Sequence, residues 1–182
     1  MASILGLSAG NVITGDDTVP TIDLVQFGNL KYLEDLRLKS LTNSIVITDF
    51  TNSLTSFANL KSKTITKLAL LSVKGMTMEQ LSVIGQFTLL EHLELGSCDQ
   101  FAPQDLFESF SELSSLKYLR LETGTFDQHI SHLGNLEHLS QLELIDFQMV
   151  GDFNQGLINL QNIRKLLLIP EYKDEVIKVF HI

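Results

Sequence analysis

The hydrophobic positions of this chain follow one short pattern that returns along most of its length. Its clearest form is Leu90-x-x-Leu93-x-Leu95, in which x is any residue. Six units share this order, with Leu or Ile in first place, and begin at Leu33, Ile65, Leu90, Leu116, Leu139 and Ile163. Self-similarity at a period of 20–50 residues is the signature of a repeat architecture. The pattern therefore predicts a stack of six similar units.

The middle leucine of each unit, called here the marker leucine, gives the spacing of the repeats. The six marker leucines are Leu36, Leu68, Leu93, Leu119, Leu142 and Leu166. A weaker unit, Ala2-x-x-Leu5-x-Leu7, fits the same frame and predicts a seventh, degenerate repeat at the start. The first two steps, from Leu5, are 31 and 32 residues long and the later ones 23 to 26. The long steps predict insertions, which we place in the polar stretches 11–21 and 42–56.

The second and third leucines of each unit are two residues apart, and this spacing favours a strand. Successive side chains of a strand point to opposite faces, so Leu36 and Leu38 point inward and Arg37 outward. In a helix the same two leucines would lie on different sides, which argues against the alternative of an ordinary α/β domain. Stacked repeats bury leucines that one repeat alone leaves exposed, so the prediction is a curved solenoid of short parallel strands.

Segments between the strands predict helices or turns on the outer face. Residues 103–110 begin with Pro and carry apolar residues at helical spacing, and residues 78–87 have a similar pattern. Residues 124–133 and 151–159 fit either a helix or an irregular segment. In the tail, apolar residues recur at helical spacing after Pro170, which predicts a C-terminal cap over 170–182.

From Leu5 to Leu168 the chain resembles the leucine-rich-repeat superfamily. The resemblance implies an α/β solenoid with a parallel sheet on the concave face and helices or turns on the convex face, as a single domain over 1–182. It also implies an interaction scaffold and no enzyme. The unit ending at Cys98 is similar to the variant with Cys or Asn at the ninth position, as found in substrate-recognising F-box adaptors of ubiquitin ligases. The other units depart from it, with Leu41, Val73, Gly124, Phe147 and Glu171 at that position.

Composition restricts the classes of partner and compartment. Hydrophobic residues make up 44% of the chain and charged residues 19%, which suits a folded domain without a membrane span. The formal charge of -9 argues against nucleic acid, because such binding depends on clustered Lys and Arg. There is one cysteine, no Asn-x-Ser/Thr site and no basic or long apolar segment at the N-terminus. These features predict a cytoplasmic or nuclear protein.

No residue pattern in the chain indicates catalysis, a cofactor or a metal. The common nucleophile, metalloprotease, thiol-redox and phosphate-loop motifs do not occur in the sequence. Cys98 lies where the repeat buries small side chains, which predicts an inert thiol. Asp127, His129 and His132 are close in sequence, yet a zinc site normally takes a further protein ligand and a defined spacing. We therefore expect solvated histidines there.

The outward residues on either side of each marker leucine predict two ladders of side chains along the concave face. Those before it are Asp35, Lys67, His92, Tyr118, Gln141 and Lys165, and those after it are Arg37, Ala69, Glu94, Arg120, Glu143 and Leu167. Residues near the middle of the stack are the expected contacts of a partner protein, since Tyr and Arg are common interface anchors. The predicted binding residues are His92, Glu94, Tyr118, Arg120, Gln141 and Glu143.

Two alternatives stay open at this stage. Arg120 lies between Glu94 and Glu143 in its ladder and can pair with its neighbours, contributing under ~1 kcal/mol, whether or not it also binds a partner. A second function, assembly of an oligomer, would use the uncapped N-terminal end of the solenoid for self-association.

Overall fold

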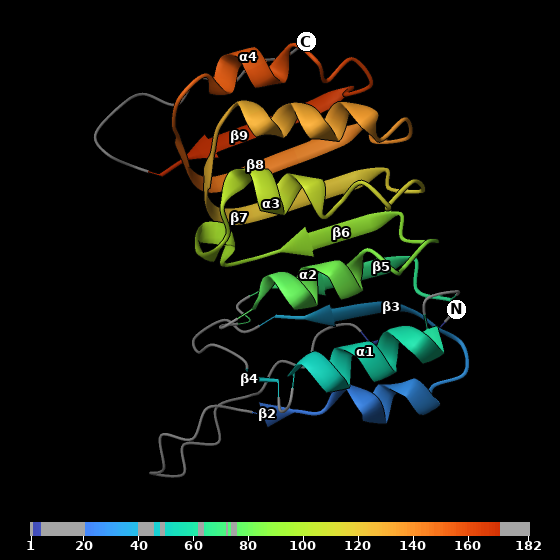
Figure 1. Ribbon diagram of the computed structural model, residues 1–182. Coiled ribbons are helices and arrows are strands. Elements are labelled where there is room, and N and C mark those ends of the chain that lie inside the picture. Colours follow the sequence, from blue (N-terminus) through green and yellow to red (C-terminus); the bar gives the residue numbers. More distant parts are fainter. Residues whose placement is uncertain are drawn as a thin grey trace.

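The chain forms a stack of strands with helices along one face, as a computed structural model shows (Figure 1). The structure describes residues 2–4, 21–39, 46–47, 50–61, 64–71, 73 and 76–171. The predicted C-terminal cap lies almost entirely outside these residues and stays a prediction. The predicted insertion at 11–21, apart from Thr21, and the residues Leu5, Leu7 and Leu41 also lie outside the described residues.

One parallel sheet of seven strands runs through the molecule in the order β1-β3-β5-β6-β7-β8-β9. Its strands are β1 (Ala2–Ile4), β3 (Leu33–Leu38), β5 (Lys67–Leu70), β6 (His92–Leu95), β7 (Tyr118–Phe126), β8 (Gln141–Met149) and β9 (Lys165–Pro170). From β3 to β9 each marker leucine pairs in register with the next. The predicted fold class, an α/β leucine-rich-repeat solenoid, is confirmed.

The first strand follows the prediction in part. Ala2 pairs with Leu33, as the frame of the weak first unit predicts, but the register then shifts between Ala2 and Ser3, so that Ile4 pairs with Leu36. The unit was therefore correctly placed beside β3, and its marker position was assigned one residue too far along the chain.

The core lies between the sheet and the helices. The first five marker leucines are fully buried, whereas Leu166 is only partly buried, contrary to our expectation. Leu166 lies on β9, the last strand in the order of the sheet, so it has a neighbouring strand on one side only among the described residues. Burial of a repeat thus depends on the repeats that flank it.

The helices pack on one face of the sheet, where Figure 1 shows α1 to α4 in front of the strands. They are η1 (Leu24–Asn29), α1 (Phe50–Lys61), α2 (Met78–Ile84), η2 (Cys98–Gln100), α3 (Pro103–Glu108), η3 (Gln128–Asn135) and α4 (Phe153–Leu157), where η is a 3-10 helix. The two predicted helices, α2 and α3, are confirmed with slightly earlier ends. A hydrogen bond from the backbone N–H of Thr77 to Gln80 Oε1, 2.6 Å long, satisfies a polar group at the start of α2.

Two outer segments differ from the expectations. Residues 42–56, read as an inserted polar stretch, contain β4 (Val46–Ile47) and the first turns of α1, which packs on η1 and α2. β4 pairs in parallel with β2 (Thr21–Ile22) in a separate small sheet. Residues 124–133 are extended at first, because β7 continues to Phe126, and only then enter η3.

A residue in the left-handed conformation follows the strand hexamer in three successive repeats. Ser97, Thr123 and Asp146 have φ values of 55°, 55° and 53°, and all three lie two residues after the third leucine of their unit. Because the left-handed residue interrupts the alternation, the next residue, at the ninth position, points back into the core. In β9 the register brings Pro170 opposite Phe147, so Pro170 and not Glu171 takes the ninth position there.

Phenylalanine rings fill the core beyond the leucines. The rings of Phe107, Phe126, Phe147 and Phe153 form a row, with centroids of neighbouring rings 5.6 Å apart. This row leaves no room for a side chain at Gly124, because a Cβ atom there would lie 2.6 Å from the ring of Phe126. The Phe126 ring thus occupies the space that the ninth-position side chains Val73, Cys98 and Phe147 fill in their own repeats.

Candidate interaction face

The face of the sheet opposite the helices, called here the open face, carries the two predicted ladders. The register aligns Asp35, Lys67, His92, Tyr118, Gln141 and Lys165 in one row. It aligns Arg37, Ala69, Glu94, Arg120, Glu143 and Leu167 in the other. Parallel strands about 4.8 Å apart hold these side chains at regular spacing.

The six predicted binding residues lie side by side on three adjacent strands. His92 and Glu94 are on β6, Tyr118 and Arg120 on β7, and Gln141 and Glu143 on β8, and all are partly exposed. The rings of His92 and Tyr118 contact each other, with centroids 5.4 Å apart and planes tilted by 31°. The sequence therefore placed these residues together, whereas their role in binding stays a prediction.

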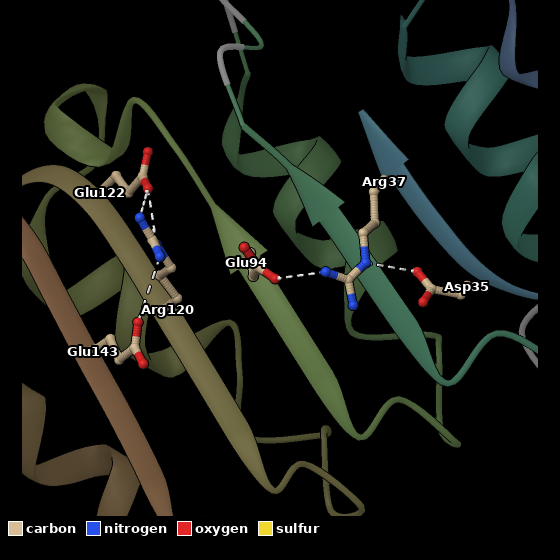
Figure 2. A network of polar contacts seen from close by, with 6 residues as sticks. All are labelled: Asp35, Arg37, Glu94, Arg120, Glu122 and Glu143. Atoms are coloured by element: carbon tan, nitrogen blue, oxygen red, sulfur yellow. Dashed lines mark hydrogen bonds and ion pairs between the residues drawn. The ribbon is translucent and has the colours of Figure 1, made fainter. Parts of the chain in front are cut away.

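Arg120 lies at the centre of one cluster of charges, which Figure 2 shows on β7 and β8. Its Nε atom donates to Glu122 Oε1 at 2.8 Å, its second guanidinium nitrogen donates to the same oxygen, and its Nη1 lies 3.5 Å from Glu143 Oε2. The expectation of a ladder of alternating charges is thus right for Glu143. The second partner is Glu122 on the same strand, two residues away.

Arg37 lies at the centre of the second cluster, on the β3 side of Figure 2. Its Nε donates to Asp35 Oδ1 at 3.0 Å, and its Nη1 lies 3.6 Å from Glu94 Oε1. Glu94 is on β6, two strands away, so the Arg37 side chain extends across β5. Ala69, the residue of β5 between them, is small enough to allow this and is only 3% exposed.

The surroundings of the aromatic pair shift the pKa values of both Tyr118 and His92. Burial raises the pKa of the Tyr118 hydroxyl, and so do a hydrogen bond with Glu143 and the negative charges of Glu143 and Glu94. Burial lowers the pKa of His92, and repulsion from Lys67 lowers it further. The pair therefore has a neutral imidazole beside a neutral phenol at pH 7.

An alkaline titration tests the environment of Tyr118. Because the pKa of Tyr118 is raised by folding, the unfolded chain loses this proton first, and stability falls as the pH rises above about 10. We expect the absorbance of tyrosinate to show one of the three tyrosines ionising late, and Tyr118→Phe to remove that late step. A wild-type titration in which all tyrosines ionise together near pH 10 would contradict the packing described for this ring.

Three apolar residues at one corner of the open face were not among the predicted binding residues. Leu167 adjoins Glu143 in the second row, and one step further along the strands Ile145 pairs with Ile169. Ile169 is 40% exposed, and the other two are partly exposed. Leu167 is already in the second row, and continuing the alternation by two residues from Glu143 and Leu167 finds Ile145 and Ile169, because residues two apart in a strand share a face. We call these three residues the apolar corner.

Other groups in the described residues do not assemble a reactive centre. Cys98 is fully buried, with its thiol 3.7 Å from the carbonyl oxygen of Leu95. His129 Nδ1 lies 3.0 Å from each carboxylate oxygen of Asp127, and the His132 ring lies 5.7 Å away. Among the residues that the structure describes, no cluster of three or more His, Cys, Asp or Glu side chains could hold a metal, and no helix could cross a membrane.

Comparisons with known proteins identify the architecture. No protein-family model and no curated protein matches the sequence. Among solved structures, internalin C2 of Listeria monocytogenes is 22% identical, with a TM-score of 0.50, over 84% of this chain and 77% of that one. An internalin, InlF, from the same organism is 18% identical, with a TM-score of 0.44, over 79% of this chain and 50% of that one. Internalins are leucine-rich-repeat proteins. Together with the register of the strands, the likeness to internalin C2 shows that this chain folds as a leucine-rich-repeat solenoid.

Proposed function

We propose that the protein is an interaction scaffold that binds another protein on its open face. The observation that carries the proposal is the in-register arrangement of six partly exposed side chains at the middle of the two rows, with a contacting aromatic pair among them. The leucine-rich-repeat fold shared with internalin C2 supports the proposal, because it suggests a protein-interaction scaffold. The predicted contacts are His92, Glu94, Tyr118, Arg120, Gln141 and Glu143.

Rigidity supports the proposal as much as residue type does. Every one of these side chains extends from a strand whose inward leucines are fully buried and whose neighbours on both sides are paired. Side chains that are fixed before binding lose less conformational entropy when a partner docks. Hot spots concentrate at such central positions and are enriched in Tyr and Arg.

A double substitution tests the proposed face. Tyr118→Ala with Arg120→Ala removes an aromatic group and a charge from partly exposed positions, so we expect the variant to melt within about 2–4 °C of the wild type. Affinity capture with mass spectrometry identifies a partner, and calorimetric titration then compares both proteins. We expect the variant to bind at least about tenfold more weakly. Lys117→Ala serves as the control, because this side chain is exposed and pairs with Glu91 outside the two rows.

Binding of the folded double variant at full strength would place the partner elsewhere on the molecule. The inserted segments at 11–21 and 42–56 are then the next surface to test by the same titration.

Assembly of an oligomer is the second candidate function. Self-association through the N-terminal end of the solenoid stays a prediction. The observation that favours assembly lies at the opposite end of the sheet, at β9, where Leu160, Ile163 and Leu168 pack on the core without full burial. Light scattering separates the two functions, because an assembly module has the molar mass of two or more chains in solution. A role as the recognition part of a larger adaptor, and a cytoplasmic or nuclear location, also stay predictions.

A further inference from the structure

We propose that the open face recognises apolar side chains of a polypeptide partner, through the aromatic pair His92 and Tyr118 and the apolar corner of Ile145, Leu167 and Ile169. In this proposal Arg37 and Arg120 form ion pairs within the face and do not bind an acidic ligand. The proposal rests on the proposed function, and it names the chemistry that the face selects.

The charges of the open face compensate one another, which is the first step of the argument. Four basic side chains extend from the two rows, namely Arg37, Lys67, Arg120 and Lys165. Four acidic side chains lie with them, namely Asp35, Glu94, Glu143 and the adjoining Glu122. The net charge of this set is zero, although that of the whole chain is -9. These eight side chains therefore give the face no net charge of its own with which to select a partner of either sign, although the charge of the whole chain still acts on long-range approach.

Both guanidinium groups already have two carboxylate partners within 4 Å. Arg37 is held by Asp35 and Glu94, and Arg120 by Glu122 and Glu143. An acidic ligand would have to displace these carboxylates, and a basic one would have to displace the arginines. Burying an unpaired charge is costly, so the exchange brings little gain. The two arginines are therefore poor receptors for an acidic ligand, whereas Lys67 and Lys165 form no ion pair within the part of the chain that the structure describes. Apolar contact at the aromatic pair and the apolar corner breaks no interaction of the face.

The apolar groups lie in two places on the face, with Gln141 and Glu143 of β8 between them, and they have a fixed separation. Tyr118 in the first row and Leu167 in the second lie two strands and one two-residue step apart. With strands ~4.8 Å apart and ~3.3 Å per residue, the two side chains start roughly 12 Å from each other. That distance matches apolar residues four apart in an extended segment, or about eight apart in a helix. The partner is thus a polypeptide with two apolar anchors at one of these spacings.

A displayed library of random dodecapeptides, selected on the full chain, tests the proposal. We expect the enriched peptides to share two apolar or aromatic residues at one of the two spacings. Fluorescence anisotropy with labelled synthetic peptides should show affinities that change less than about threefold between roughly 0.05 M and 0.5 M NaCl. Ile169→Asp and Leu167→Gln should each weaken binding at least about tenfold.

The matched control is Ile158→Asp, which makes the same change at a residue that is 65% exposed and follows α4 on the helix side of the sheet. It should bind the peptides as the wild type does, and thermal melts should show that all variants are folded. Enrichment of acidic or basic peptides with a steep salt dependence would overturn the inference.

The outcomes also separate this inference from the proposed function. In one outcome, the peptides bind the Tyr118→Ala, Arg120→Ala variant more weakly but bind Ile169→Asp and Leu167→Gln with full affinity. That result would support the open face as the binding site and overturn its selectivity for apolar residues. Peptides that bind all these variants equally, or a library without binders, would count against both.

Discussion

Leu93→Ala and Leu119→Ala should each lower the free energy of unfolding by ~2–5 kcal/mol. Both side chains are fully buried on the central strands β6 and β7, with a repeat on either side. Truncation removes apolar area from the core and leaves a cavity that well-packed neighbours fill only in part. Chemical denaturation of each variant gives the change, read at constant m-value.

Leu89→Ala is the matched control for these two substitutions. It makes the same chemical change at a leucine that is 46% exposed, so we expect a loss within about 0.5 kcal/mol. Equal effects at buried and exposed leucines would contradict the assignment of the marker leucines to the core.

Phe126 and Gly124 should form a strongly coupled pair. Phe126→Ala removes a fully buried ring that contacts Phe107 and Phe147, so we expect a loss of ~3–5 kcal/mol. Gly124→Val places a side chain 2.6 Å from the same ring and 3.2 Å from the Cβ of Cys98, so overpacking should cost ~1–3 kcal/mol.

The combined variant tests whether the ring and the glycine share one space. With Phe126 shortened, the valine fills part of the cavity, as Val73 does at the ninth position of its own repeat. The double variant should therefore lose less stability than the two single losses together, which a double-mutant cycle by denaturant unfolding measures. Additive losses would show that the two residues do not compete for the same volume.

The strands could be predicted because their signal is local. A leucine two residues from another leucine defines the inward face of a strand, and the same frame in each repeat fixes the register between strands. This is why Leu36, Leu93 and Leu142 were placed correctly without knowledge of the structure, and why the two rows of the open face followed. The one-residue error at β1 arose where the pattern was weakest and the ladder irregular.

The side-chain contacts of the open face could not be predicted, because they depend on how far each side chain extends toward neighbouring strands. That Arg37 pairs with Glu94 follows from the small size of Ala69 between them, which no pattern within one repeat reveals. Leu167 belongs to the predicted second row, but the other two residues of the apolar corner, Ile145 and Ile169, lie just beyond the hexamer, where the repeats differ more. The start of α1 within residues 42–56 was missed because the whole stretch was interpreted as a polar insertion, although Phe50, Leu54 and Phe57 recur at helical spacing in α1.

The bridge from Arg37 to Glu94 has a consequence for how the solenoid unfolds. In a linear array, stability is approximately a sum of terms within repeats and between adjacent ones, so the array opens one repeat at a time from its ends. An ion pair across β5 adds a term between two repeats that are not adjacent, though a small one of under ~1 kcal/mol at this exposure. It therefore makes separate opening of β3 slightly less favourable and favours opening of β3, β5 and β6 together by the same small amount. Amide hydrogens of β3 and β5 should therefore exchange at similar rates in native conditions. In the Glu94→Gln variant, the amides of β3 should exchange faster than those of β5.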